Sequence, residues 1–280
     1  MKIIKNIDVQ GIHGKPIVTD VFYKENHTKK PVIIFCHGYK GFKDWGAWNN
    51  MAEIFAEADV FFIKFNFSHN GGTLEQPIDF PDLEAFGNNN YTKELDDLKS
   101  VIDWLFTNEN FENEADLNQI TLLGHSRAGG IVTIKAEEDS RISKVISLAG
   151  VSDYGKRSST TGDLDQWQKE SVKYVINGRT KQKMPHYIQF YHNFIENEAR
   201  LTISRAVKNL SIPYLIIHGN NDTSVSIEEA YNLKNWCKHS ELKIIDDANH
   251  VFEASHPWQK QDIPAQLQEV INSVLSFIKT

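Results

Sequence analysis

A serine stands between an apolar run and a segment with helical spacing in the stretch Thr121-Leu122-Leu123-Gly124-His125-Ser126-Arg127-Ala128-Gly129-Gly130. A strand that runs directly into a helix turns sharply at such a serine, and only small side chains two residues before and after it avoid collision. Gly124 and Ala128 meet that requirement. The turn lifts the hydroxyl clear of the sheet and places the helix N-terminus and the Arg127 N–H beside it. The stretch therefore predicts that Ser126 is a nucleophile.

Length and composition indicate one globular α/β domain. The 280 residues are long enough to bury a sizeable core, and 40% apolar with 24% charged residues is typical of a soluble protein. The net charge of -7 argues against a nucleic-acid surface. No stretch is long enough to span a bilayer, and residues 1–6 lack the apolar run of a signal peptide, so we expect a cytoplasmic protein.

Short apolar runs alternate with segments of helical spacing along the chain. We expect a β-hairpin at 2–9 and 17–24, strands at 31–36, 60–65, 119–123, 144–149, 213–218 and 242–245, and helices at 46–57, 91–107, 127–138, 226–238 and 263–278. A run of βα units forms a mostly parallel, doubly wound sheet with helices on both faces. Such a sheet carries its ligand groups at the carboxyl ends of its strands.

One segment interrupts this alternation. About sixty residues separate the strand ending near 149 from the strand starting at 213, which is far more than a crossover needs. We interpret 150–212 as a helical cap inserted between two strands of the single 1–280 domain, with helices at 163–176 and 186–208. Its aromatic residues Trp167, Tyr187 and Tyr191 are candidates for contacting substrate. The alternative is that the cap's aromatic residues form only the small core of the cap.

Two further sites follow predicted strands and supply partners for the serine. Asp222 follows the strand at 213–218, and His250 follows the strand at 242–245. The fold would bring both to the same sheet edge as Ser126. An imidazole bonded to the serine can accept its proton, and an acid can fix the tautomer of that imidazole. The other candidates for the acid are Asp153, Asp246 and Asp247.

The remaining histidines have other expected places. We expect His218 to pack at the end of its strand and His125 to point away from the site. His37 belongs to the stretch 35–42, where we expect it to shape a loop by hydrogen bonding. In the same loop, the Tyr39 N–H is the predicted partner of the Arg127 N–H in holding a developing oxyanion.

Nothing in the sequence predicts a metal or a cofactor. Acidic residues at 79, 82 and 84 are not accompanied by a histidine or cysteine cluster, so we interpret them as a solvated loop. The glycine-containing stretch 66–72 lacks the lysine and the spacing of a phosphate-binding loop. Cys36 and Cys237 lack metal-site spacing; we expect buried free thiols, with a disulfide as the alternative.

The chain resembles the α/β-hydrolases, because it carries their motifs in the same order along the sequence. The motifs are His37-Gly38-Tyr39, Gly124 to Gly129 around Ser126, His218-Gly219 with Asp222, and His250. Within that superfamily it is similar to the branch of dienelactone hydrolases, prolyl-oligopeptidase-type peptidases and cinnamoyl or feruloyl esterases. Two departures are Ala128 in place of the second glycine of G-x-S-x-G, and a His-Gly-Tyr-Lys-Gly oxyanion loop. Dienelactone hydrolases proper use a cysteine nucleophile, so dienelactone cleavage is not implied.

The resemblance implies a serine hydrolase that cleaves a small carboxylic ester through an acyl-enzyme, as a monomer or homodimer, without cofactor. A thioesterase or small-peptide hydrolase would use the same three residues. A ligand-binding protein without catalysis is the alternative from another class, because fold does not fix function.

Overall fold

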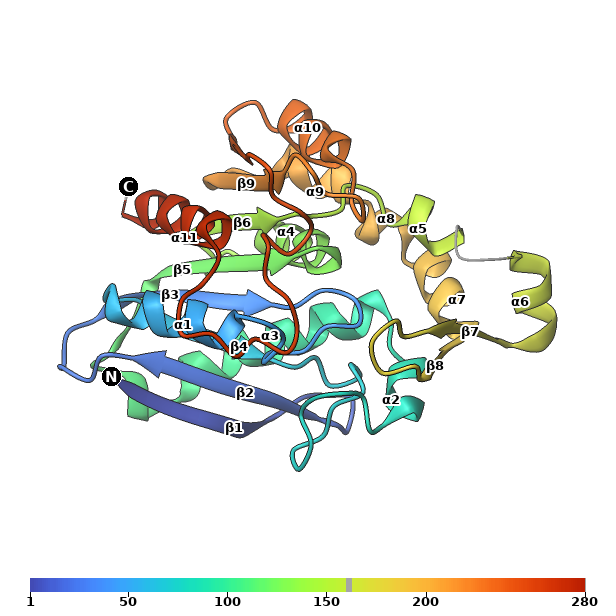
Figure 1. Ribbon diagram of the computed structural model, residues 1–280, viewed down its shortest axis with the longest axis horizontal. Coiled ribbons are helices and arrows are strands. Elements are labelled where there is room, and N and C mark those ends of the chain that lie inside the picture. The colour runs from blue at the N-terminus through green and yellow to red at the C-terminus, as the bar shows by residue number, and fades with distance from the viewer. Residues whose placement is uncertain (160–162, 280) are drawn as a thin grey trace.

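The computed structural model describes residues 1–159 and 163–279. A single eight-stranded sheet runs through it (Figure 1). In spatial order its strands are β1 (Lys2–Gln10), β2 (Pro16–Tyr23), β4 (Phe61–Phe65), β3 (Lys30–Cys36), β5 (Ala115–His125), β6 (Lys144–Leu148), β9 (Tyr214–Gly219) and β10 (Glu241–Ile245). The pairs β1–β2 and β2–β4 are antiparallel and every other neighbouring pair is parallel. The terminal hairpin and the mostly parallel sheet were predicted, whereas the pairing of β2 with β4 was not.

The central strands are apolar on both sides because both faces of the sheet are covered. In β3, Val32 and Ile34 belong to one buried cluster, whereas Ile33 and Phe35 belong to the other. The alternation of side chains along a strand therefore serves two cores at once.

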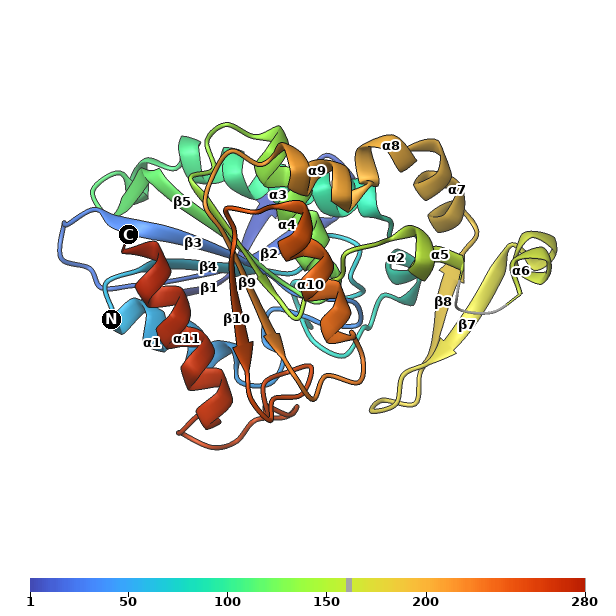
Figure 2. The same cartoon turned by 90° about the horizontal axis from the view of Figure 1, so that it is seen from above.

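Helices cover each face of the sheet (Figure 2). One core receives side chains from α3 (Tyr91–Thr107), α4 (Arg127–Glu138) and α10 (Ile227–Trp236). The other core receives them from α1 (Trp48–Glu57) and α11 (Ala265–Ile278). These are the five helices predicted from the sequence, and the doubly wound fold class is confirmed.

The segment between β6 and β9 differs in detail from the prediction. It contains α5 (Gly155–Ser159), α6 (Leu164–Glu170), β7 (Val172–Ile176), β8 (Lys183–Tyr187), α7 (Gln189–Glu196), α8 (Glu198–Leu201) and α9 (Ile203–Asn209). The expected helix at 163–176 ends at residue 170, and the expected helix at 186–208 is three short helices. Strands β7 and β8 form an antiparallel hairpin that the sequence analysis missed.

Local chemistry explains the missed hairpin. Ser171 takes the left-handed conformation, with φ of 62°, and ends α6 there. The residues that follow it, Val172 to Ile176, are largely β-branched or aromatic and favour a strand.

Two short elements were also not predicted, α2 (Leu83–Gly87) and a turn of 3-10 helix at Glu109–Phe111. Helix α2 packs against β8.

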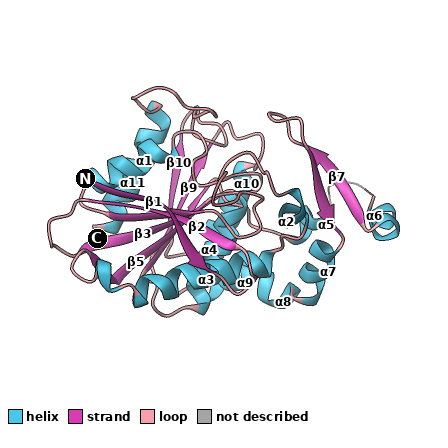
Figure 3. Cartoon of the chain, turned by 90° about the horizontal axis from the view of Figure 1, so that it is seen from below, coloured by secondary structure: helices cyan, strands magenta, loops and turns pink. Residues whose placement is uncertain are grey.

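The inserted segment lies beyond the carboxyl ends of strands β3 and β5, with β7 and α6 at the far end of the molecule (Figure 3). Elsewhere, Cys36 and Cys237 are buried free thiols, so the alternative of a disulfide is wrong. Among residues 1–159 and 163–279, no helix is long and apolar enough to cross a membrane.

Candidate active site

The turn between β5 and α4 has the geometry that its sequence predicts. Ser126 has φ of 57° and ψ of -121°, a conformation that L residues rarely adopt. A Cβ placed on Gly124 would lie 2.3 Å from the Ala128 carbonyl oxygen, so only glycine fits there. The Ser126 N–H donates to the Leu148 carbonyl at 2.8 Å, which ties the turn to the neighbouring strand β6.

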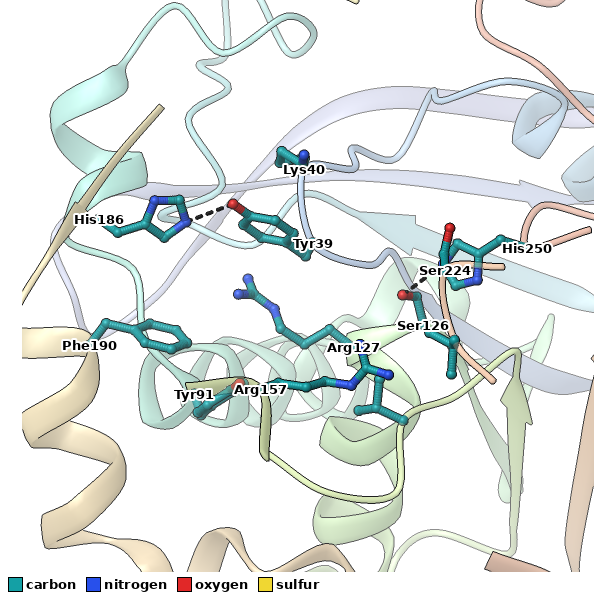
Figure 4. A pocket seen from close by; sticks show the side chains of 12 residues that line it. Tyr39, Lys40, Tyr91, Ser126, Arg127, Arg157, His186, Phe190, Ser224 and His250 are labelled. Carbon is teal, nitrogen blue, oxygen red and sulfur yellow. Dashed lines mark hydrogen bonds between the residues drawn. The ribbon is translucent and has the colours of Figure 1, made fainter. Parts of the chain in front are cut away.

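Ser126, His250 and Asp222 lie in one hydrogen-bonded line. His250 Nε2 is 2.9 Å from Ser126 Oγ (Figure 4), and His250 Nδ1 is 2.7 Å from Asp222 Oδ2. The three residues come from the loops after β5, β10 and β9, whose carboxyl ends meet at this edge of the sheet. The arrangement can hold the imidazole with Nδ1–H toward the carboxylate and Nε2 ready to accept the serine proton.

Asp222 is the acid that the structure brings to His250. The N–H groups of Ser224 and Val225 donate to its Oδ1 at 2.8 and 2.9 Å, which fixes the carboxylate. Burial opposes its ionisation, but hydrogen bonds from His218 and His250 outweigh burial and hold the pKa of Asp222 below its usual range. The three alternative acids make no hydrogen bond to His250 within the described part of the chain.

Two histidines near these residues were not expected at the site. His218 is fully buried, donates from Nε2 to the Val225 carbonyl at 2.9 Å, and lies 3.4 Å from Asp222 Oδ2. His125 donates from Nε2 to the His250 carbonyl at 2.9 Å, and its ring centroid is 4.9 Å from that of His250. The expectation that His125 points away from the site is therefore wrong. Both contacts join residues that are distant in sequence, so no local pattern indicates them.

The loop after β3 approaches the serine closely. A Cβ on Gly38 would lie 2.8 Å from Ser126 Cβ, so this position requires glycine. His37 donates from Nδ1 to the Gly38 carbonyl at 2.9 Å, and its Nε2 lies 3.4 Å from the Phe67 N–H. Burial lowers the pKa of His37 to about 4. A neutral imidazole therefore shapes the loop that carries Tyr39, as expected.

Two cavities meet at Ser126 and His250. The first, of about 410 Å³, is lined by Tyr39, Tyr91, Phe190 and charged side chains (Figure 4). The second, of about 580 Å³, is lined by the rings of Trp45, Trp48 and His256 and by residues 177–179 of the inserted segment. A substrate with a part on each side of its reacting carbonyl fits this division.

The cap residues predicted to contact substrate do not line either cavity. Trp167 is buried and donates from Nε1 to the His186 carbonyl at 2.8 Å, and Lys173 Nζ lies 3.4 Å from its ring centroid. The Tyr187 hydroxyl is bonded to Glu84 of α2. Tyr191 packs toward Trp167, with ring centroids 6.3 Å apart. Trp167 and Tyr191 thus pack within the inserted segment, whereas Tyr187 contacts α2 outside it, so the alternative of a core confined to the cap holds only in part.

His186 and Phe190 reach the first cavity instead. Burial raises the pKa of Tyr39 to about 12 and lowers that of His186 to about 4, so both groups are neutral near pH 7. A neutral hydrogen bond of 2.7 Å joins the Tyr39 hydroxyl and His186 Nε2 (Figure 4). This hydrogen bond joins the loop after β3 to strand β8.

The acidic residues at 79, 82 and 84 have partners of their own. Asp79 pairs with Arg179, and Asp82 accepts from the Ala85 N–H at the start of α2. Glu84 accepts from Tyr187. In the described ranges, no group of three or more histidine, cysteine or acidic side chains could hold a metal ion.

The sequence model of the family described as "alpha/beta hydrolase fold" matches residues 31–204 and 165–257. The chain belongs to this family.

Solved structures share the fold over nearly the whole chain. Est1E from Butyrivibrio proteoclasticus is 18% identical, with a TM-score of 0.71, over 99% of this chain and 98% of that one. A putative dienelactone hydrolase from Klebsiella pneumoniae is 12% identical, with a TM-score of 0.62, over 100% of each chain. An uncharacterized 31.7 kDa protein of Escherichia coli is 26% identical over 57% of this chain, which spans about half of that relative's length.

Proposed function

We propose that this protein is a serine hydrolase that cleaves a carboxylic ester through an acyl-enzyme. The observation that carries the proposal is the line from Ser126 through His250 to Asp222, with contacts of 2.9 and 2.7 Å. Its position at a strained strand-to-helix turn beside two cavities supports the same conclusion.

In the first half of the reaction, Ser126 Oγ attacks the acyl carbonyl while His250 Nε2 accepts its proton. The imidazolium is stabilised by the ionised Asp222 and then gives the proton to the leaving alcohol. Water attacks the acyl-enzyme in the second half, again with His250 as base. In that half His250 takes a proton from the water and returns it to Ser126 Oγ as the acid is released, which restores the free enzyme.

The Tyr39 and Arg127 N–H groups are the proposed donors to the oxyanion. Among the described residues, neither N–H donates to a protein acceptor, which leaves both available. Arg127 is the first residue of α4, where helix N–H groups have no partner within the helix. The close approach of Gly38 to Ser126 brings the Tyr39 loop to the same place.

We further propose that 150–212 acts as a cap over the site. The contact of His186 with Tyr39 and the position of Phe190 in the first cavity support this. Substrate choice would then depend on His186 and Phe190 rather than on Trp167, Tyr187 and Tyr191.

Labelling with a fluorophosphonate tests the nucleophile. We expect the wild type to react and Ser126→Ala to be inert, with Ser224→Ala, the other serine of the first cavity, as the matched control that still reacts. Labelling of Ser126→Ala at the wild-type rate would contradict the assignment. Absence of labelling in the wild type would favour the ligand-binding alternative.

A matched panel of ester, thioester and amide with the same acyl group tests the leaving group. We expect the ester to give the largest kcat/KM. A larger value for the thioester or for a peptide amide would identify the enzyme as a thioesterase or peptidase with the same residues.

A further inference from the structure

The first cavity is lined by cationic side chains. Among the described residues its lining contains Lys40, Arg127 and Arg157 and no aspartate or glutamate. The proposed mechanism uses the backbone N–H of Arg127 as an oxyanion donor, but it uses none of these three side-chain charges. Their presence beside a proposed nucleophile requires a separate explanation.

The Arg127 side chain is held in place and still has donors to offer. It is only 16% exposed, and one terminal nitrogen donates to the buried Glu94. The guanidinium carbon lies 5.0 Å from the Tyr39 ring centroid, 5.7 Å from that of Tyr91 and 5.9 Å from that of Phe190. Among the residues that the structure describes, Glu94 is the single acceptor for this group. The other donors of its planar fork are available to a ligand.

Glu94 lies behind the arginine rather than in the cavity. It is 2% exposed and also accepts from Asn89 Nδ2 at 2.7 Å. Burial raises the pKa of Glu94 although Arg127 opposes the rise. The Glu94 side chain balances and orients the guanidinium of Arg127 from behind. The rest of the guanidinium faces the cavity. Figure 4 shows the guanidinium away from Ser126, among Tyr39, Phe190 and Tyr91.

Arg157 and Lys40 add positive charge to the same space. Arg157, on α5, is paired through Nη2 with Glu229 at 3.2 Å, and Glu229 also accepts from Ser152. Lys40 Nζ lies 5.1 Å from the Tyr39 ring centroid and pairs with no carboxylate in the described part of the chain. Three cations thus face the cavity, and the carboxylates paired with them in the described part of the chain, Glu94 and Glu229, are not among its lining residues.

We propose that this cavity binds a free carboxylate of the substrate, so that the preferred ester carries a carboxylate in addition to the ester group. Arg127 would receive it on its planar fork, as guanidinium groups receive carboxylates, and Lys40 and Arg157 would add attraction. The aromatic rings around Arg127 would hold the intervening carbon chain. This inference rests on the proposed function and names its substrate class.

Two matched pairs of substrates test the proposal on both sides of the ester. The first pair is the p-nitrophenyl half-ester of adipic acid and its isostere in which an isopropyl group replaces the free carboxylate. The second pair is the acetate ester of p-hydroxybenzoate and that of p-isopropylphenol. We expect the wild type to prefer the carboxylate member of one pair by about tenfold or more in kcat/KM.

Three variants test whether the named cations cause the preference. The double variant Glu94→Gln with Arg127→Gln removes both charges of the buried pair, and we expect it to lower the preference about tenfold. Lys40→Gln and Arg157→Gln should each lower it about threefold. Lys156→Gln, on the exposed surface of α5, is the matched control and should leave it unchanged.

The outcomes separate this inference from the function on which it rests. Fluorophosphonate labelling with no carboxylate preference in either pair would overturn the inference alone. A preference that persists in the double variant and in both single variants would also overturn it. Absence of labelling would contradict the proposed function and the inference together. If circular dichroism shows the double variant unfolded, Lys40→Gln and Arg157→Gln decide.

Discussion

Two groups of buried charge in this protein are built from the same kinds of side chain and are completed differently. Between β2 and β4, Lys64 Nζ lies 2.8 Å from Asp20 and 2.6 Å from Asp44. Lys43 Nζ lies 2.8 and 2.6 Å from the same two carboxylates. Every charge in this four-residue cluster meets two opposite charges.

The cations of the first cavity form the contrasting case. Arg127 meets one carboxylate, and Lys40 meets none in the described part of the chain. In the four-residue cluster every charge is paired with protein charges, and the fold itself satisfies the set. Arg127 and Lys40 have fewer partners than donors among the described residues, so they can bind a ligand. We infer from this difference that the first cluster stabilises the folded protein and that the cavity cations recognise substrate.

Breaking the four-residue cluster should have the largest effect. Lys64→Met leaves two buried aspartates with a single lysine, so we expect the free energy of unfolding to fall by about 3–5 kcal/mol. Urea denaturation measures the change. Lys99→Met, which removes an exposed pair with Asp103, is the control and should cost about 0.5 kcal/mol or less. A similar loss for both variants would contradict the comparison.

A buried carboxylate that forms no ion pair among the described residues gives the next effect. Asp97 accepts from the Ser68 N–H and Oγ, each at 2.8 Å, and burial raises its pKa to about 7. The folded state therefore binds this proton more tightly than the unfolded state, whose pKa is near the ordinary 3.8. Stability from this group is present below that value and is lost as the pH rises through about 7.

Urea denaturation between these two pH values measures the slope. We expect Asp97→Asn to flatten the decline of stability with rising pH, because asparagine does not titrate. Asp165→Asn, which replaces an exposed carboxylate of α6, is the control and should keep the slope. Equal slopes for wild type and Asp97→Asn would show that another group causes the decline.

Removing the carboxylate partner of Arg127 should lower the free energy of unfolding less than breaking the four-residue cluster does. In Glu94→Gln the guanidinium loses its carboxylate but still borders a cavity of about 410 Å³ that water can enter. We expect a loss of about 1–2 kcal/mol, measured by the same denaturation. A loss as large as that of Lys64→Met would place Arg127 with the structural charges.

Salt should have the smallest effect. Raising the ionic strength from about 0.05 to 0.5 M should lower kcat/KM for the preferred carboxylate ester by about threefold, because it screens the attraction to the cavity. The neutral isostere is the control and should change little. Equal responses would contradict an electrostatic origin of the preference.

The sequence predicts what depends on local pattern. The turn at Ser126, the succession of strands and helices, and the places of Asp222 and His250 after their strands follow from motifs and from hydrophobic periodicity. The hairpin β7–β8 was missed although Val172 to Ile176 locally favour a strand, because helical spacing was followed across the helix end at Ser171 and the pairing with β8 and α2 is not local.

The contents of the cavities could not be predicted for the same reason. Arg127 was named for its backbone N–H, and its side-chain role depends on Glu94 of another helix. Phe190 and His186 reach the cavity while Trp167, Tyr187 and Tyr191 do not. Helical spacing predicts that these residues are buried but does not predict what they face.

The hydrogen bond from Tyr39 to His186 has a consequence for the history of this fold. Tyr39 lies on a loop of the sheet, whereas His186 lies on the inserted segment. An insertion acquired from another protein would leave the tyrosine hydroxyl buried without its hydrogen-bond partner. The two residues should therefore be inherited together, and replacing one in a relative should be accompanied by replacement of the other.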